Sequence, residues 1–369
     1  MSRSIDRRMR PTAVLGEAIR DVSSGTTRMG VFALIFILLV GLIAAADVNA
    51  VAGVVRQVVG FRAAGASVLT LKAEQSVDGQ RCSRLMGVGA ITGAAALRPG
   101  QPVTLAAMPS SPVTGVEATP DLLALLQTIA QPITIDPGTS AGIWLSADVA
   151  SLLQAQPGDT VPTSAGPVQV AAIYTWPDDG RGRDLGYAMV TPVAADGVFS
   201  QCWIETWPLS DTVTNLLNLS VINPNPDNPA TINQLNTSLG LQLDGQALLD
   251  KRLTAQAGWV AGIAGLLLGF TATRSRRLEI ADALHVGITR TALLWQQLLE
   301  TVIWVTASLI IVAAALLWLV GALGQEPAWA IWLTGLRAVI AAAATTLLGA
   351  LLGASSAREK NLAHYAKDR

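Results

Sequence analysis

Few residues in this 369-residue sequence could carry out enzymatic chemistry, and they lie far apart along the chain. The segment GTSAG at 138–142 fits the G-x-S-x-G pattern of serine hydrolases, with Ser140 as the nucleophile. Such a nucleophile needs a neighbouring base, and the two histidines are His285 and His364. The charge layout described below places both histidines on the opposite side of a membrane from Ser140. We therefore attribute the match to chance and predict no catalytic residue.

Metal and nucleotide chemistry is not indicated either. Two histidines and two cysteines on opposite sides of a membrane do not make up the usual zinc ligand sets. The phosphate-binding pattern G-x-x-x-x-G-K-[ST] does not occur, so we expect the chain to bind no ATP of its own. The net charge of −1 gives no indication of a nucleic-acid partner. The sequence thus predicts a protein that is not an enzyme and binds no cofactor by itself.

Two polar features of the middle region have alternative interpretations. The run Asp178–Asp184 (DDGRGRD) could be a ligand-binding loop, but a solvated turn is the favoured interpretation. Cys82 and Cys202 could be two buried thiols or a disulfide, and an even pair in an oxidising compartment favours the disulfide. That bond would close a loop of about 120 residues, worth about 4–5 kcal/mol in the chain-entropy model.

Four apolar stretches are long enough to cross a bilayer, for which about 20 residues suffice. The chain is 51% hydrophobic and 14% charged, which is unusually apolar for a soluble protein of this length. Lys and Arg residues cluster in 1–28, in 274–290 and in the C-terminal tail, and none occurs in 324–328. Because positive charge favours the cytoplasmic side, both termini and 274–290 are predicted to be cytoplasmic. The predicted organisation is a cytoplasmic amphipathic N-terminal helix within 1–28, a first span at 29–47, an outer domain with stalks at 48–253, a second span at 254–273, a cytoplasmic connector at 274–292, a third span at 293–323, an outer loop at 324–328, a fourth span at 329–353 and a cytoplasmic tail at 354–369.

The amphipathic helix is expected at 11–23, where apolar residues recur at helical spacing. The first span is predicted to be a permanent anchor, the alternative being a cleaved signal peptide ending near Ala44–Ala46. Valines at helical spacing beyond Asp47 predict a stalk that continues from this span. Residues 240–256 are expected to return to the membrane as a second stalk.

The outer region predicts an α+β domain, because alternating and helical patterns are mixed along it. The whole chain is therefore predicted to be a multi-pass α-helical membrane protein with this domain between its first and second spans. Strands are expected at 67–74, 103–107 and 167–176, and helices at 121–130, 146–153 and 229–239.

Several residues in the spans have types that suggest packing or ion pairing. Gly258 and Gly262, and then Gly265 and Gly269, form two pairs at four-residue spacing, which favours close helix packing, either within one chain or between two copies. Arg337 could extend outward to the interface or pair with Asp47, and Glu300 lies at the inner end of the third span.

The connector 274–292 is expected to contain a short helix at the cytoplasmic face. Ser275 could cap its start, with Glu279 in its first turns. Gly287 occupies a position typical of a helix C-terminus, and Thr289 could cap the helix that follows. A short helix between two spans offers a surface on which a cytoplasmic partner can act.

This connector resembles that of FtsX/MacB-like ABC transporter permeases. The resemblance rests on Arg277-Leu-Glu279-Ile280, on Gly287 eight residues after Glu279, and on Thr289-Arg290. Glu300 is similar to a glutamate found early in the third span of that family, and the order of the spans is similar as well. The resemblance implies an ATPase-coupling surface formed by Arg276, Arg277, Glu279, Ile280, Leu284, Gly287 and Arg290.

The resemblance also implies a function, a setting and partners. The chain would be the permease subunit of an ABC transporter in a bacterial cytoplasmic membrane, coupling ATP hydrolysis to movement of its outer domain. It would export or extract a lipid, peptide or drug-like substrate. The alternative is a signalling scaffold that activates cell-wall hydrolases or reports ligand binding. The implied partners are two ABC ATP-binding subunits, which bring ATP and Mg, a second copy of this chain or a related permease, membrane lipids and an extracytoplasmic protein.

Overall fold

The computed structural model describes residues 29–105, 108–138, 142–163, 166–224 and 226–356, which fall into two compact units. The helical unit contains residues 29–56 and 245–356, and the sheet unit contains residues 57–244. The helix predicted at 11–23, most of the tail, Ser140 and His364 lie outside the described residues.

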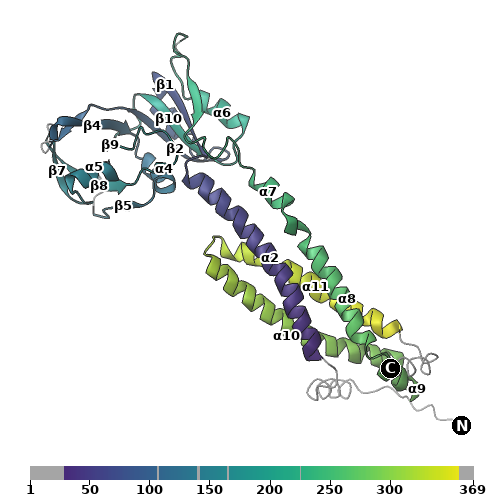
Figure 1. The fold of residues 1–369 in the computed structure, drawn as a ribbon. Helices are drawn as coiled ribbons and strands as arrows, with labels where there is room; N and C mark the ends of the chain where they lie inside the picture. The colour runs from purple at the N-terminus through teal and green to yellow at the C-terminus, as the bar shows by residue number, and fades with distance from the viewer. Residues whose placement is uncertain (1–28, 106–107, 139–141, 164–165, 225, 357–369) are drawn as a thin grey trace. The chain divides into compact units, whose positions relative to one another are not determined.

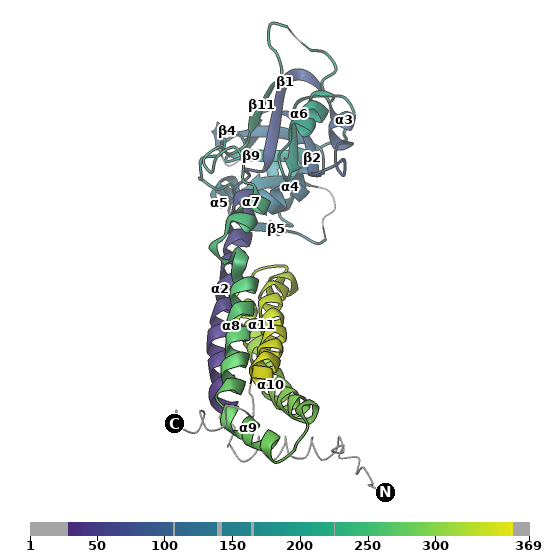
Figure 2. The same ribbon diagram turned by 90° about the vertical axis from the view of Figure 1, so that its right-hand side faces the viewer.

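Four long apolar helices dominate the helical unit, and each is long and apolar enough to cross a membrane. The predicted four-span architecture is thus confirmed, and the helices lie side by side in Figures 1 and 2. The first has 35 residues, or about 52 Å at 1.5 Å per residue, against about 30 Å for the bilayer core. It therefore continues well past the span, as its valine pattern predicts. The helices are α2 (Met29–Ala63), α8 (Ala257–Arg274), α10 (Arg290–Leu323) and α11 (Ala328–Ser356).

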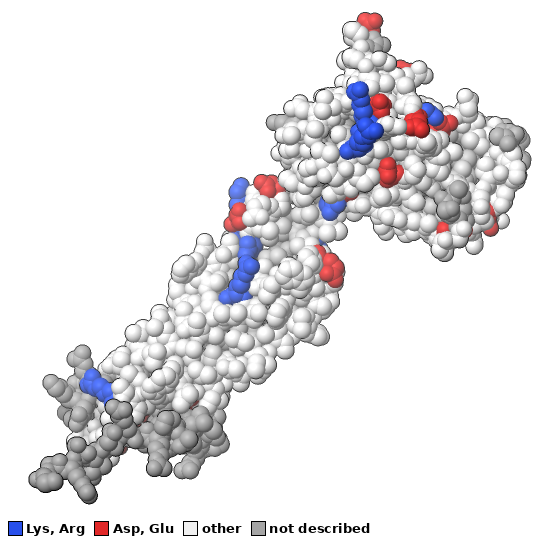
Figure 3. Space-filling view, turned by 180° about the vertical axis from the view of Figure 1, so that it is seen from behind, with Lys and Arg blue, Asp and Glu red and all other residues white. Residues whose placement is uncertain are grey.

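One face of each long helix is buried against the others. Phe36 of α2 meets Trp304 of α10 edge to face, with ring centroids 6.2 Å apart. Val312 of α10 and Ala342 of α11 belong to the same buried cluster. The opposite side of α2 exposes large aliphatic residues such as Leu42, as a surface solvated by lipid chains requires. Over the face shown in Figure 3, few charged side chains interrupt the surface of this unit.

The sheet unit is built from eleven strands within the described residues. Their order is β11-β1-β10-β2-β4-β3-β7-β8-β6-β9, with β5 pairing β8. Because β4 also pairs with β9, the strands from β4 round to β9 close into a ring, while β11, β1, β10 and β2 extend from it as an open sheet (Figure 1). The strands are β1 (Val68–Asp78), β2 (Ile91–Pro99), β3 (Val103–Leu105), β4 (Met108–Ala118), β5 (Ile133–Ile135), β6 (Ile143–Ser146), β7 (Thr160–Thr163), β8 (Gly166–Tyr174), β9 (Ala188–Pro192), β10 (Val198–Thr206) and β11 (Thr231–Gln234).

Helices cover both faces of the open sheet, so the predicted α+β class is confirmed. Trp203 of β10 faces the leucines of α4, whereas Leu71 of β1 faces Leu217 of α6 on the other side. The ring has its own core, which includes Leu145 and Val170. The short helices of this unit are α3 (Gly79–Ser83), α4 (Leu122–Ile129), α5 (Ala147–Leu153) and α6 (Asp211–Asn218).

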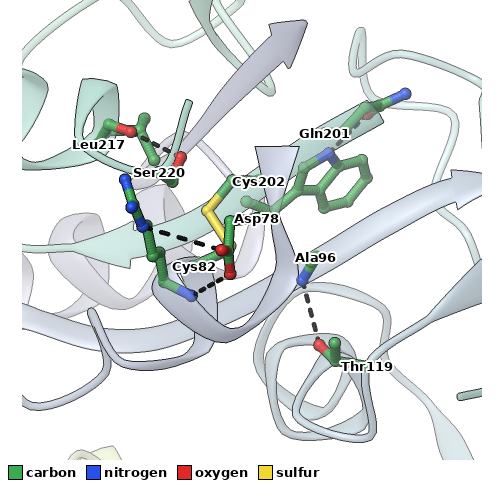
Figure 4. The surroundings of a disulfide bond; sticks show 10 residues. Asp78, Cys82, Ala96, Thr119, Gln201, Cys202, Leu217 and Ser220 are labelled. Carbon is green, nitrogen blue, oxygen red and sulfur yellow. Dashed lines mark hydrogen bonds and ion pairs between the residues drawn. A yellow bond between two sulfur atoms is a disulfide. The ribbon is translucent and has the colours of Figure 1, made fainter. Parts of the chain in front are cut away.

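A disulfide joins Cys82 of α3 to Cys202 of β10, and both residues are fully buried (Figure 4). Asp78 holds the start of α3 by accepting a hydrogen bond from the backbone amide of Arg81 at 2.9 Å. Cys202 lies in the centre of the open sheet, opposite Leu71 of β1 and Ala96 of β2. The bond therefore attaches a peripheral helix to the middle of the sheet.

The prediction of a helix at 229–239 is wrong. Residues Thr231–Gln234 form β11, whose backbone pairs with β1 from Leu69 to Lys72. The edge of β1 provides this segment with backbone hydrogen-bond partners along one side, which outweighs its local pattern. The segment that returns to the helical unit contains α7 (Gly245–Lys251) and a 3-10 turn at Leu253–Gln256.

Candidate coupling site

The connector folds as a short helix, α9 (Arg277–His285), between α8 and α10. The expectation that Ser275 caps this helix is wrong. Ser275 has helical backbone angles as the C-cap of α8, and its hydroxyl donates to the carbonyl of Ala272 at 2.8 Å. A serine hydroxyl in a helical turn commonly bonds back to the preceding turn, and here that bond takes the place of the cap.

The end of α9 is fixed by Gly287, which occupies the position that the sequence predicts. Its φ of +96° lies in the left-handed region, where glycine carries no steric penalty. The amide of Gly287 donates to Leu284 and that of Ile288 donates to Ala283, both at 3.1 Å. These two bonds form the Schellman arrangement that satisfies the last carbonyls of a helix. The connector therefore turns sharply after α9.

The next helix begins at once. Thr289 has extended backbone angles, and its hydroxyl accepts a hydrogen bond from the amide of Ala292 at 3.4 Å. It is thus the N-cap of α10, as the sequence predicts. With a Schellman turn on one side and a capped helix on the other, α9 is held in a defined direction relative to α10.

One face of α9 is seated on its neighbours. Ile280 is 5% exposed and packs in a cluster with Leu293 of α10 and, at its edge, Leu284. A pocket of about 140 Å³ lies here, bordered also by Ala354 and Ser355 of α11. Burying a side chain the size of isoleucine stabilises by about 1.5–3 kcal/mol, so this seat holds α9 against the spans.

A charged cluster makes the second attachment. Arg276, just before α9, donates from Nη1 to the carboxylate of Glu300 and from Nε to Glu279 at 2.7 Å. The side chain of Glu300 is 2% exposed and also accepts from the amides of Gln296 at 3.2 Å and Gln297 at 3.4 Å. A buried carboxylate needs such partners to remain charged. Glu300 therefore anchors the connector to α10 through its ion pair with Arg276.

The electrostatics of Arg276 follow from this geometry. Burial would lower the pKa of its guanidinium, but the carboxylates of Glu300 and Glu279 outweigh burial and raise that pKa above its ordinary value. Arg276 is thus a permanent cation placed between one buried and one exposed carboxylate.

The opposite face of α9 is exposed. Glu279, Asp282 and Val286 follow one another at helical spacing, and Val286 is 75% exposed. Arg290 is exposed after the turn, whereas Arg277 is half-buried. The structure brings Arg276, Glu279 and Glu300 together, and it separates the exposed Glu279 and Asp282 from the seated Ile280 and Leu284.

The four predicted glycines of α8 do not behave alike. A Cβ on Gly265 would lie 2.3 Å from the carbonyl oxygen of Ala342, and one on Gly269 would lie 2.0 Å from that of Thr346. These two glycines therefore bring α8 into backbone contact with α11 of the same chain. A Cβ on Gly262 would make ordinary contact, and one on Gly258 would meet nothing within 4 Å.

Of the two interpretations given for Arg337, outward extension and pairing with Asp47, the pairing is wrong. Asp47 is buried in α2, and the Nε of Arg252 donates to it at 3.0 Å. Arg252 lies just before the 3-10 turn that leads into α8, so it binds Asp47 from the returning chain. Arg337 is exposed and forms no ion pair within the described residues. The partner of Asp47 thus lies outside the four predicted spans.

No cluster of three or more metal-binding side chains occurs in the part of the chain that the structure describes. The connector combines a seated helix, a buried ion pair and an exposed helix face.

The sequence matches no protein-family model, and no curated protein matches it. Among solved structures, the chain is similar to the periplasmic region of MacB from Actinobacillus actinomycetemcomitans, with 10% identity and a TM-score of 0.35 over 47% of this chain and 91% of that one. It is also similar to the extracellular domain of the noncanonic ABC-type transporter YknZ from Gram-positive bacteria, with 13% identity and a TM-score of 0.29 over 42% of this chain and 100% of that one.

Proposed function

We propose that this chain is an FtsX/MacB-like permease subunit that couples a separate ATP-binding subunit to movement of its sheet unit. The observation that carries the proposal is α9 itself. It is a short helix, seated on α10 and α11, tied to Glu300 through Arg276, and exposed along the face of Glu279, Asp282 and Val286. Force applied to that face reaches the spans through both attachments.

The four apolar helices and the layout of positive charge support a cytoplasmic position for α9 and an outer position for the sheet unit. In this arrangement, two ATP-binding subunits, with their ATP and Mg, would close against the α9 helices of two permease chains. The continuous helix α2 contributes residues to both units, so movement of the spans has a direct covalent route to the sheet unit. The substrate would be a lipid, peptide or drug-like molecule handled outside the membrane.

Association with an ATP-binding subunit is the first test. The full chain is co-expressed with a candidate ABC ATP-binding protein from the same organism, and the complex is purified in detergent. Asp282→Lys reverses the charge in the middle of the exposed face of α9 and is expected to abolish co-purification. The matched control is Asp148→Lys, which makes the same change on the exposed surface of α5 in the sheet unit. Equal recovery of the ATP-binding subunit with both variants would refute the assignment of α9.

The signalling alternative uses the same connector and is separated by phenotype. Cells lacking the chain are compared for retention of radiolabelled lipid or peptide and for cell-wall defects. Retention supports transport, whereas a wall defect without retention would favour the signalling scaffold.

A further inference from the structure

The loop at 178–187 in the sheet unit contains two kinds of arginine. Arg183 pairs with Asp178 at 2.8 Å, and both side chains are 80% exposed. For these residues the predicted solvated turn is correct. The side chain of Arg181, by contrast, is only 1% exposed. A buried guanidinium in a surface loop requires a specific set of partners.

Those partners are the ends of two helices and one carboxylate. Arg181 donates from Nε and Nη2 to the two carboxylate oxygens of Asp179 at 2.8 and 2.6 Å. Its Nη2 also donates to the carbonyl of Ala63 at 3.0 Å, and its Nη1 donates to that of Ile129. Ala63 ends α2 and Ile129 ends α4. Four of the five N–H donors of a guanidinium are thus used.

The end of α2 is held by further groups from the same region. Gly65 has a φ of +71°, and the amides of Gly65 and Ala66 close a Schellman turn onto Arg62 and Phe61. The side-chain amide of Asn236 donates to the carbonyl of Ala64 at 2.9 Å and to Asp179 at 3.2 Å. The last carbonyls of α2 therefore bond to side chains of the 178–187 loop and the segment after β11.

The positive charge of Arg181 stabilises the two helix ends that it contacts. The C-terminal end of a helix carries unpaired carbonyls and partial negative charge, which a cation stabilises. Arg181 serves two such ends at once, and its guanidinium lies 5.2 Å from the ring centroid of Trp176. The hydrogen bond from Arg181 lowers the pKa of Asp179, with a smaller opposing effect of burial. Asp179 is thus ionised at neutral pH, and its hydrogen bonds with Arg181 fix the loop to the helix.

The same loop also borders a pocket of about 470 Å³. Arg183, Asp184, Leu185 and Tyr187 line one side of it, and Arg98 and Trp203 contribute from the sheet. Leu185 is buried and Tyr187 is 37% exposed, so the loop bridges the core and the mouth of the pocket. One short segment therefore contacts both the end of α2 and this pocket.

We propose that Arg181 couples the position of the α2 end to the shape of this pocket through the 178–187 loop. Displacing Ala63 would pull on the guanidinium, and the loop would carry the displacement to Leu185 and Tyr187. What would displace α2 rests on the proposed function. The link between the end of α2 and the pocket does not, because it is made by residues of this chain alone. Arg181 is a positioning residue, and lysine cannot replace its forked contacts.

The test is reciprocal hydrogen exchange on the full chain in lipid nanodiscs. Arg181→Gln is expected to speed amide exchange at 57–66 by about tenfold or more, since it removes charge-assisted bonds. Gly65→Ala alters the α2 end instead, because its Cβ would lie 3.0 Å from Leu235 at a left-handed φ. It is expected to speed exchange at 178–187, including the amide of Gly186, which is bonded to Arg183 at 2.9 Å.

Arg183→Gln, which removes the exposed pair in the same loop, is the control and should leave exchange at 57–66 unchanged. Exchange at β1 and β10 reports whether each variant retains its fold. If each substitution affected only its own segment while the sheet stayed protected, the coupling would be disproved.

A second measurement adds the ATP-binding subunit and a non-hydrolysable ATP analogue. Nucleotide should change exchange at 178–187 in the unaltered complex and not in Arg181→Gln, although both bind the subunit. If nucleotide changed nothing in the unaltered complex while the reciprocal effects persisted, the proposed function would fail and the coupling would stand. A nucleotide response that survived Arg181→Gln would overturn the coupling role of Arg181.

Discussion

Arg276 and Glu300 form an ion pair between the connector and the first turns of α10, and Glu279 shares the same guanidinium. The two carboxylates differ in exposure, because the side chain of Glu300 is 2% exposed and that of Glu279 is 62% exposed. Arg276 therefore binds one buried carboxylate, that of Glu300, and one exposed carboxylate on α9, that of Glu279. The two bonds should contribute unequally to stability.

Substituting the buried partner is expected to be the costly change. Glu300→Gln removes the charge that Arg276 requires, and disrupting a buried pair costs about 3–5 kcal/mol. Glu279→Gln changes the exposed partner of the same arginine and should cost about 1 kcal/mol or less. Thermal unfolding of the full chain in detergent measures both. Equal losses for the two variants would contradict the assignment of Glu300 as the anchor of the connector.

The glycines of α8 provide a second matched pair. Gly269→Ala would force a methyl group into the backbone of α11, and overpacking of this kind costs about 1–3 kcal/mol. Gly258→Ala meets nothing within 4 Å and should be neutral or slightly stabilising in a helix. Unfolding in detergent again compares them. A chain that tolerated Gly269→Ala but lost self-association with Gly258→Ala would instead place the dimer contact at the open end of the stripe.

The disulfide predicts a large effect from a single substitution. Cys82 and Cys202 are 120 residues apart, so the loop-closure estimate is about 4–5 kcal/mol. The double variant Cys82→Ser/Cys202→Ser is expected to unfold at a lower temperature than the oxidised chain and to lose its mobility shift on non-reducing gels. Unchanged unfolding and mobility would mean that the cysteines are not bonded in the native protein.

The pair of Asp179 and Arg181 predicts a pH dependence. The hydrogen bond from Arg181 lowers the pKa of Asp179 in the folded state, so the unfolded state binds its proton more readily. The stabilising contribution is therefore complete above the ordinary carboxylate pKa of about 4 and is lost as pH falls below it. Asp179→Asn should reduce stability near neutral pH and flatten its dependence on pH in that acidic range, measured by tryptophan fluorescence. Asp178→Asn removes an exposed carboxylate and should leave the curve unchanged.

Local chemistry made much of the fold and connector predictable. The spans are long apolar runs, and Gly287 and Thr289 mark helix ends through their own backbone and hydroxyl groups. Ser275 differs from its prediction because its hydroxyl could bond to either of two adjoining helices, and the preceding one provides the partner.

The remaining features depend on contacts between distant segments. Gln234 lies in a strand because Leu69 is opposite it in β1, and no local pattern contains that information. Arg252 binds Asp47 across about 200 residues, and the burial of Arg181 depends on the end of α2. Sequence spacing identified the charged residues in these regions but could not determine their partners.

The unbroken helix α2 has one more consequence, which concerns its phase. Within α2, Asp47 accepts a hydrogen bond from Arg252, and the Nη2 of Arg62 donates to the Oε1 of Glu205 at 2.7 Å. Inserting one residue between Asp47 and Arg62 would turn these two side chains by about 100° relative to each other around the axis of α2. Inserting seven residues would nearly restore the original angle. The two ion pairs therefore restrict the length of this segment of α2. Relatives that keep both pairs should differ here only by insertions or deletions of nearly whole helical turns.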